Sequence, residues 1–67
     1  MHYPKLKGVM AEQGVTIVEL SKMTGISYGS LAPKLRGAFK LTVEDAMKIK
    51  NALGTEMRLE ELFYDND

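Results

Sequence analysis

Basic side chains recur along the first half of the chain, where they can bind phosphate. Lys34, Arg36 and Lys40 carry ammonium or guanidinium groups, which attract phosphate oxygens. The formal net charge is zero, yet residues 1–40 hold six Lys or Arg against two Asp or Glu, a net charge of +4, and residues 41–67 hold three against seven, a net charge of −4. This division indicates that one half binds a polyanion and the other avoids it. Ordinary solubilising charges and a chance asymmetry are the alternative interpretations.

Little in the chain is suited to catalysis. It has no Cys and a single His, His2, which lies at the terminus and for which no role is expected. Glu60 and Glu61 are interpreted as solvent-facing charges, and neither metal-ligand spacing nor a glycine-rich phosphate loop occurs. We therefore expect no enzyme, no cofactor and no metal site. The lack of Cys suits the cytoplasm, and the short apolar stretches predict neither a membrane span nor a signal peptide.

Caps, apolar spacing and helix breakers predict five helices and no strand, in one all-α domain over residues 1–67. Thr16 and Glu19 have the spacing of a capping box, Ser27 is expected to cap the next helix, and Thr42 with Asp45 the one after. The predicted helices cover residues 4–13, 17–23, 28–35, 43–53 and 58–63.

The second and third predicted helices are separated by a short turn that contains Gly25. This spacing is typical of a helix-turn-helix, in which the second helix of the pair enters the major groove of DNA and the first lies across the backbone. Pro33 falls inside the third helix, where Gly29, four residues earlier, leaves room for its ring. The side chains expected in the core around this turn are Leu20, Ile26, Leu31 and Leu35.

The run from Val15 to Ser27 resembles the helix-turn-helix of lambda-repressor-like, Cro-type (XRE) phage regulators. The stretch from Lys34 to Gly37, residues 41–54 and the pair Leu62-Phe63 continue the resemblance, which covers about residues 5–63. The resemblance implies a compact five-helix bundle with a central helix-turn-helix. It also implies a phage or prophage repressor that binds double-stranded operator DNA as a homodimer.

The resemblance assigns DNA contacts position by position. Many members carry glutamine where this chain has Ile17, so a familiar hydrogen bond is missing there. Among the family's reading positions only Tyr28 has a polar side chain, so DNA shape or a partner must contribute to specificity. A half-buried surface aromatic is the alternative interpretation of Tyr28. Base contacts are expected from Tyr28, Gly29, Ser30, Pro33 and Lys34. Phosphate contacts are expected from Thr16, Ile17, Lys22, Ser27, Arg36, Gly37 and Lys40.

Apolar residues near the C-terminus are expected to form the dimer interface, because a terminal Leu-Phe pair is hard to bury in so small a bundle. These residues are Met57, Leu59, Leu62 and Phe63. The alternative hypothesis is a protein-interaction module of the same fold, such as an antitoxin, an anti-repressor or a polymerase-binding modulator, that uses the acidic half. Zero net charge and Pro33 in the recognition helix favour this alternative. The sequence fits Phe39 equally well as a core plug or as an exposed side chain.

Overall fold

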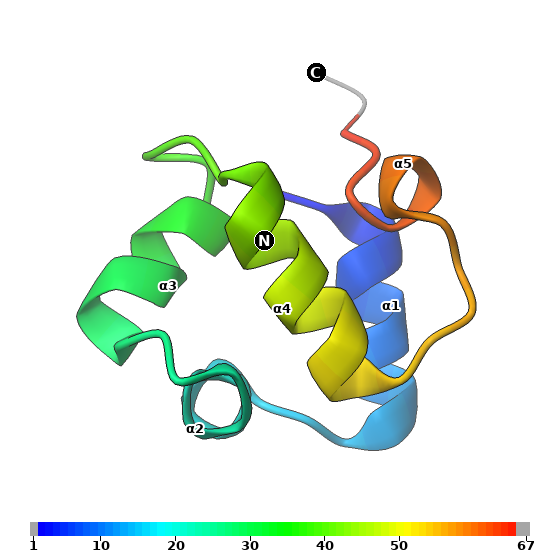
Figure 1. Ribbon diagram of the computed structural model, residues 1–67, viewed down its shortest axis with the longest axis horizontal. Coiled ribbons are helices and arrows are strands. Elements are labelled where there is room, and N and C mark those ends of the chain that lie inside the picture. The colour runs from blue at the N-terminus through cyan, green and yellow to red at the C-terminus, as the bar shows by residue number, and fades with distance from the viewer. Residues whose placement is uncertain (1, 66–67) are drawn as a thin grey trace.

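The protein, seen in a computed structural model that describes residues 2–65, consists of helices joined by short loops (Figure 1). No strand occurs within residues 2–65, so the predicted all-α, five-helix fold is confirmed. The bounds of the first, third and fourth helices coincide with the predicted ranges, the second is one residue longer, and the fifth is shorter at both ends. The helices are α1 (Pro4–Gln13), α2 (Ile17–Thr24), α3 (Tyr28–Leu35), α4 (Val43–Leu53) and α5 (Leu59–Leu62). Residues 1, 66 and 67 of the predicted domain lie outside the described part.

Helix α2 begins with the predicted capping box. The Thr16 hydroxyl accepts the backbone N–H of Glu19 at 3.1 Å, and the Glu19 carboxylate accepts the backbone N–H of Thr16 at 3.0 Å. The hydrogen bond from the Thr16 backbone N–H is the main reason why the pKa of Glu19 lies below its ordinary value, and the Thr16 hydroxyl adds to this effect. Gly25 ends the helix in the left-handed conformation, with φ of +78°.

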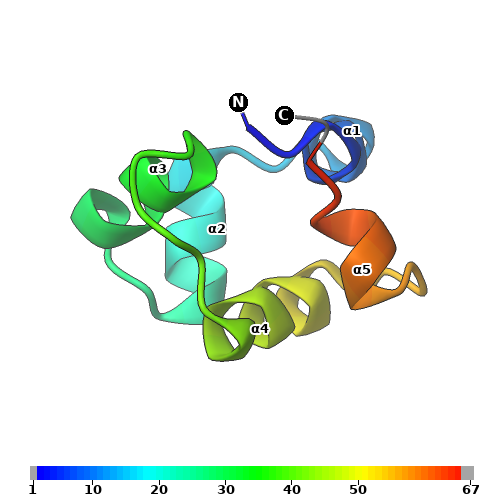
Figure 2. The same cartoon turned by 90° about the horizontal axis from the view of Figure 1, so that it is seen from above.

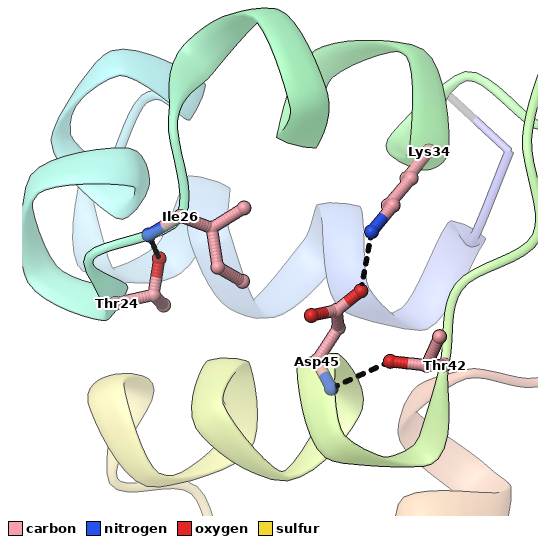
Figure 3. A network of polar contacts seen from close by, with 5 residues as sticks. All are labelled: Thr24, Ile26, Lys34, Thr42 and Asp45. Carbon is pink, nitrogen blue, oxygen red and sulfur yellow. Dashed lines mark hydrogen bonds and ion pairs between the residues drawn. The ribbon is translucent and has the colours of Figure 1, made fainter.

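Of the next two predicted N-caps, only that of α4 forms its cap hydrogen bond. Ser27 stands at the N-cap of α3, but its hydroxyl makes no cap hydrogen bond. Thr42 does cap α4, because its hydroxyl accepts the backbone N–H of Asp45 at 3.1 Å. The Asp45 carboxylate does not complete a capping box and binds Lys34 of α3 (Figure 3). The local spacing of Thr42 and Asp45 gave no sign of this longer-range contact.

One apolar core holds all five helices together. Helix α2 lies against both α3 and α4, and α5 lies against α4 and α1, so α4 joins the two pairs (Figure 2). The radius of gyration is 10.5 Å, close to the ~11 Å expected for a compact chain of this length. Ile26, predicted in the core, packs against it while remaining partly exposed. The buried cluster comprises Leu6, Met10, Leu20, Leu31, Leu35, Ile49, Leu53 and Leu62.

The segment before α1 ties the end of α3 to the segment after α5. The backbone N–H of His2 donates to the Leu35 carbonyl at 2.9 Å, and its ring Nε2 contacts the Asp65 carboxylate. The Tyr3 ring meets the Phe63 ring edge to face, with centroids 5.6 Å apart. His2, for which no role was expected, is therefore part of the packing. Within residues 2–65, no helix has the length and apolar character that crossing a membrane requires.

Candidate nucleic-acid interface

The turn between α2 and α3 is braced by side chains of α2. The Thr24 hydroxyl donates to the Leu20 carbonyl at 2.8 Å and accepts the backbone N–H of Ile26 at 3.2 Å (Figure 3). The Ser21 hydroxyl donates to the Ile26 carbonyl at 2.6 Å. These bonds satisfy both backbone groups of the residue in the middle of the turn. They fix the direction in which α3 leaves α2, which is what a groove-reading helix needs.

Helix α3 is divided into a buried side and an exposed leading end. Its buried residues, Leu31, Ala32 and Leu35, face the core. Tyr28, with 45% of its surface exposed, and the neighbouring Gly29 are open to solvent. The backbone N–H groups of these two residues have no partner within residues 2–65, so they carry the partial positive charge of a helix N-terminus. The exposed residues at this end, Ser27, Tyr28, Gly29 and Ser30, form a surface that we call the α3 tip.

The two later positions of α3 that were expected to touch bases are less accessible. Pro33 is half-buried, and its carbonyl accepts the backbone N–H of Ala38 at 2.9 Å. The Lys34 ammonium lies 2.6 Å from the Asp45 carboxylate, and the two side chains are 21% and 14% exposed. In Figure 3 the Lys34 side chain points from α3 toward α4. In the free protein the ammonium is thus held between two helices, and the predicted base contact would require Lys34 to leave Asp45.

Unpaired cations stand on either side of the α3 tip in the chain. Lys22 lies on α2, and Arg36 and Lys40 lie at the end of α3 and in the loop beyond it; all three are exposed. None of the three takes part in an ion pair within residues 2–65. They are therefore free to neutralise phosphates.

The uncharged residues assigned to phosphate have different surroundings. Thr16, Ser27 and Gly37 are exposed. Ile17 is half-buried and packs against the core, so its side chain contributes to folding and only its backbone N–H, at the start of α2, remains for an anion.

Gly37 shapes the loop that follows α3. Its φ is +85°, and a Cβ atom built on it would lie 2.7 Å from the ring of His2. The positive φ favours glycine here, and any larger residue would also displace the His2 ring. No sequence pattern pointed to this contact between Gly37 and His2, because the residues lie at opposite ends of the first half of the chain.

The residues predicted to form the dimer interface are buried or half-buried within a single chain. Leu62 is fully buried within one chain, which corrects the expectation that the small bundle leaves it exposed. Met57, Leu59 and Phe63 are half-buried, and of these Met57 and Phe63 pack against the core. Leu59 and Phe63 also line a shallow pocket of about 360 Å³ beside the start of α4. The large apolar side chains that are exposed within residues 2–65 are other residues, of which Val43 also lines this pocket: Val18, Met23, Tyr28, Phe39, Val43, Met47 and Tyr64.

Comparison of the sequence with models of known families gives one match. A family model described as the Cro/C1-type HTH DNA-binding domain matches residues 5–67, almost the whole chain. No curated protein and no solved structure shows a significant match.

Proposed function

The chain belongs to the Cro/C1-type helix-turn-helix family of DNA-binding domains, and from this premise we propose that it is a cytoplasmic transcriptional repressor of phage or prophage type that recognises operator DNA through α3. The observation that carries this proposal is the α3 tip, an exposed helix start on a braced turn. Lys22, Arg36 and Lys40 stand free near it in the chain. A small uncharged helix start, with exposed cations on the helix before it and just beyond the end of its own helix, fits a major groove between two phosphate backbones.

We assign direct reading of bases to the exposed residues of α3. The Tyr28 and Ser30 hydroxyls donate and accept hydrogen bonds, and Gly29 lets the helix backbone approach the base edges closely. Pro33, half-buried, offers a carbon surface that suits a thymine methyl group. Few of these contacts are bidentate, so the shape of the operator contributes to the choice of sequence.

We assign positioning on the backbone to the residues around the α3 tip. Thr16, Ser27 and the backbone N–H of Ile17 stand at helix starts, where phosphate is favoured. Lys22, Arg36, Gly37 and Lys40 complete the set. Three cations that each neutralise one phosphate predict that log K falls with log salt at a slope of about −2.7 per chain.

Two copies of the chain are proposed to bind one operator, with half-sites about one helical turn apart. One apolar surface open to a partner is the shallow pocket lined by Leu59, Phe63 and Val43, of which Val43 is 72% exposed. Met57 lies half-buried nearby in the chain. Sedimentation of the protein with operator DNA should give two chains per duplex. One chain per duplex at saturation would remove the dimer and leave DNA binding intact.

Selection of bound fragments from random duplex DNA, followed by a salt titration of the winning sequence and of random duplex, tests the function. We expect a preferred operator and, for both duplexes, affinity that falls steeply with salt. An absence of binding to any duplex at low salt would overturn the proposal and favour a protein-binding module of the same fold.

A further inference from the structure

Helix α3 carries one charged residue, Lys34, and the fold directs it away from the exposed surface. Its ammonium lies 2.6 Å from the Asp45 carboxylate, and both side chains are mostly buried (Figure 3). The Asp45 backbone is held in the first turn of α4, because its N–H donates to the Thr42 hydroxyl that caps the helix. The pair therefore joins the last turn of α3 to the first turn of α4.

A free lysine at this position would change what α3 recognises. A flexible ammonium binds a phosphate of any sequence, and in the groove it prefers the O6 and N7 acceptors of guanine. Four carbons separate the ammonium from the backbone, so a lysine released from Asp45 would reach well beyond the helix surface. With Lys34 held by Asp45, the exposed residues of α3 are all uncharged.

We propose that Asp45 is a specificity-determining residue that acts by holding Lys34 away from the DNA. Asp45 is a positioning residue that need not touch DNA itself. Its effect is to remove a sequence-independent contact, which leaves the choice of sequence to Tyr28 and the rest of the α3 tip. This inference rests on the proposed function of α3 as the reading helix.

The test compares the salt dependence of binding to random duplex DNA among four variants. In Asp45→Asn the released Lys34 gains one phosphate, so the slope should steepen by about 0.9. Affinity for random duplex should then rise, and the preference for the operator should fall. In Lys34→Gln the slope should stay that of the wild type. The double variant should match Lys34→Gln, because no ammonium remains to be released.

Glu44→Gln is the matched control. Glu44 is exposed, lies next to Asp45 in the first turn of α4 and forms no ion pair within residues 2–65. Its replacement changes the net charge and the helix terminus in the same way but frees no lysine. Its slope should match that of the wild type, which separates release of Lys34 from a general change in charge.

Two outcomes of the binding experiment would overturn the inference while leaving DNA binding in place. One is a slope in Asp45→Asn that equals that of Glu44→Gln. The other is a slope in Lys34→Gln that is shallower than wild type by about 0.9, which would mean that Lys34 already contacts DNA. If the wild type bound no duplex, the proposed function and this inference would fall together. NMR titration of the Asp45 carboxyl in the free wild type and in Lys34→Gln tests the ion pair without DNA, and an unchanged titration would also overturn the inference.

Discussion

Arg36 and Tyr28 illustrate the division of labour that we propose among single residues. The Arg36 guanidinium is exposed and unpaired within the described residues, at the end of α3. Tyr28 is 45% exposed at its beginning. A cation beside the groove positions the protein on any duplex, whereas a side chain in the groove distinguishes one base pair from another.

Arg36→Ala should weaken binding to all sequences to a similar extent and reduce the salt slope by about 0.9. Tyr28→Ala should leave that slope unchanged. It should reduce the difference in binding free energy between the selected operator and a duplex changed at the base pair that Tyr28 contacts, by about 1–3 kcal/mol. Fluorescence anisotropy on a panel of such duplexes measures both effects. Identical effects of the two substitutions would contradict the assigned roles.

Thr16 and Ser27 occupy equivalent N-cap positions but differ in their use of the hydroxyl. Thr16 accepts the backbone N–H of Glu19, while Ser27 forms no cap bond. Thr16→Ala should therefore lower the free energy of unfolding by about 1 kcal/mol. Ser27→Ala should change it by less than about 0.5 kcal/mol. Urea denaturation gives both values.

The same pair separates folding from binding. Because its hydroxyl is not used within the fold, Ser27→Ala should weaken DNA binding at almost unchanged stability. A loss of stability in Ser27→Ala as large as that in Thr16→Ala would show that Ser27 does cap α3.

At the scale of elements, the junction between α3 and α4 depends on an ionised carboxylate. The hydrogen bond from the Lys34 ammonium, above all, lowers the pKa of Asp45 in the folded protein. The unfolded chain, with the higher pKa, therefore binds more protons, and stability rises with pH in the acidic range. The stabilisation is complete above the ordinary pKa of aspartate, about 3.9, and is lost as pH falls through the lowered value.

Unfolding free energies measured by urea from about pH 6 down to about pH 2 should show this loss. Asp45→Asn, which cannot ionise there, should lose less stability over the same range than the wild type. Glu44→Gln again serves as the control, because Glu44 has no ion pair within residues 2–65. Parallel curves for wild type and Asp45→Asn would contradict the stabilising role of the Lys34–Asp45 pair.

Local patterns were enough to predict the elements but not the contacts between them. The capping box of Thr16 and Glu19 was predicted because both partners lie within one turn of helix. Lys34 and Asp45 are eleven residues apart. From its neighbours in the sequence, Lys34 was interpreted as a lysine that contacts bases and Asp45 as an acid that caps a helix. No periodicity links such a pair, because its existence depends on where the tertiary fold places the end of α3 relative to the start of α4.

The same limit applies to the ends of the chain. Leu62 was expected at an interface because a small bundle seemed unable to bury it, yet it is fully buried. Tyr3, which packs against Phe63, helps to close the core over that region. The contribution of a segment that precedes the first helix is invisible to helical periodicity, and so was the contact of His2 with Gly37.

At the scale of the whole molecule, the division of charge along the sequence is only partly a division in space. Two of the cations in the basic half, Lys5 and Lys7, lie on α1, which packs against the acidic α5 (Figure 2). Lys5 is 6.0 Å from the centre of the Tyr64 ring. The cations near the α3 tip in the chain are therefore fewer than the sequence count suggests. We therefore expect affinity for DNA to depend on Lys22, Arg36 and Lys40.

The most direct measurement is a titration of ¹⁵N-labelled protein with the selected operator, followed by the backbone amide shifts. The central claim is that α3 and the residues around its ends form the surface that meets DNA. We predict the largest shifts at residues 27–30 and 36–40 and at Thr16 and Lys22, with small shifts along α5. Shifts confined to α4 and α5, with residues 27–30 unmoved, would contradict the claim.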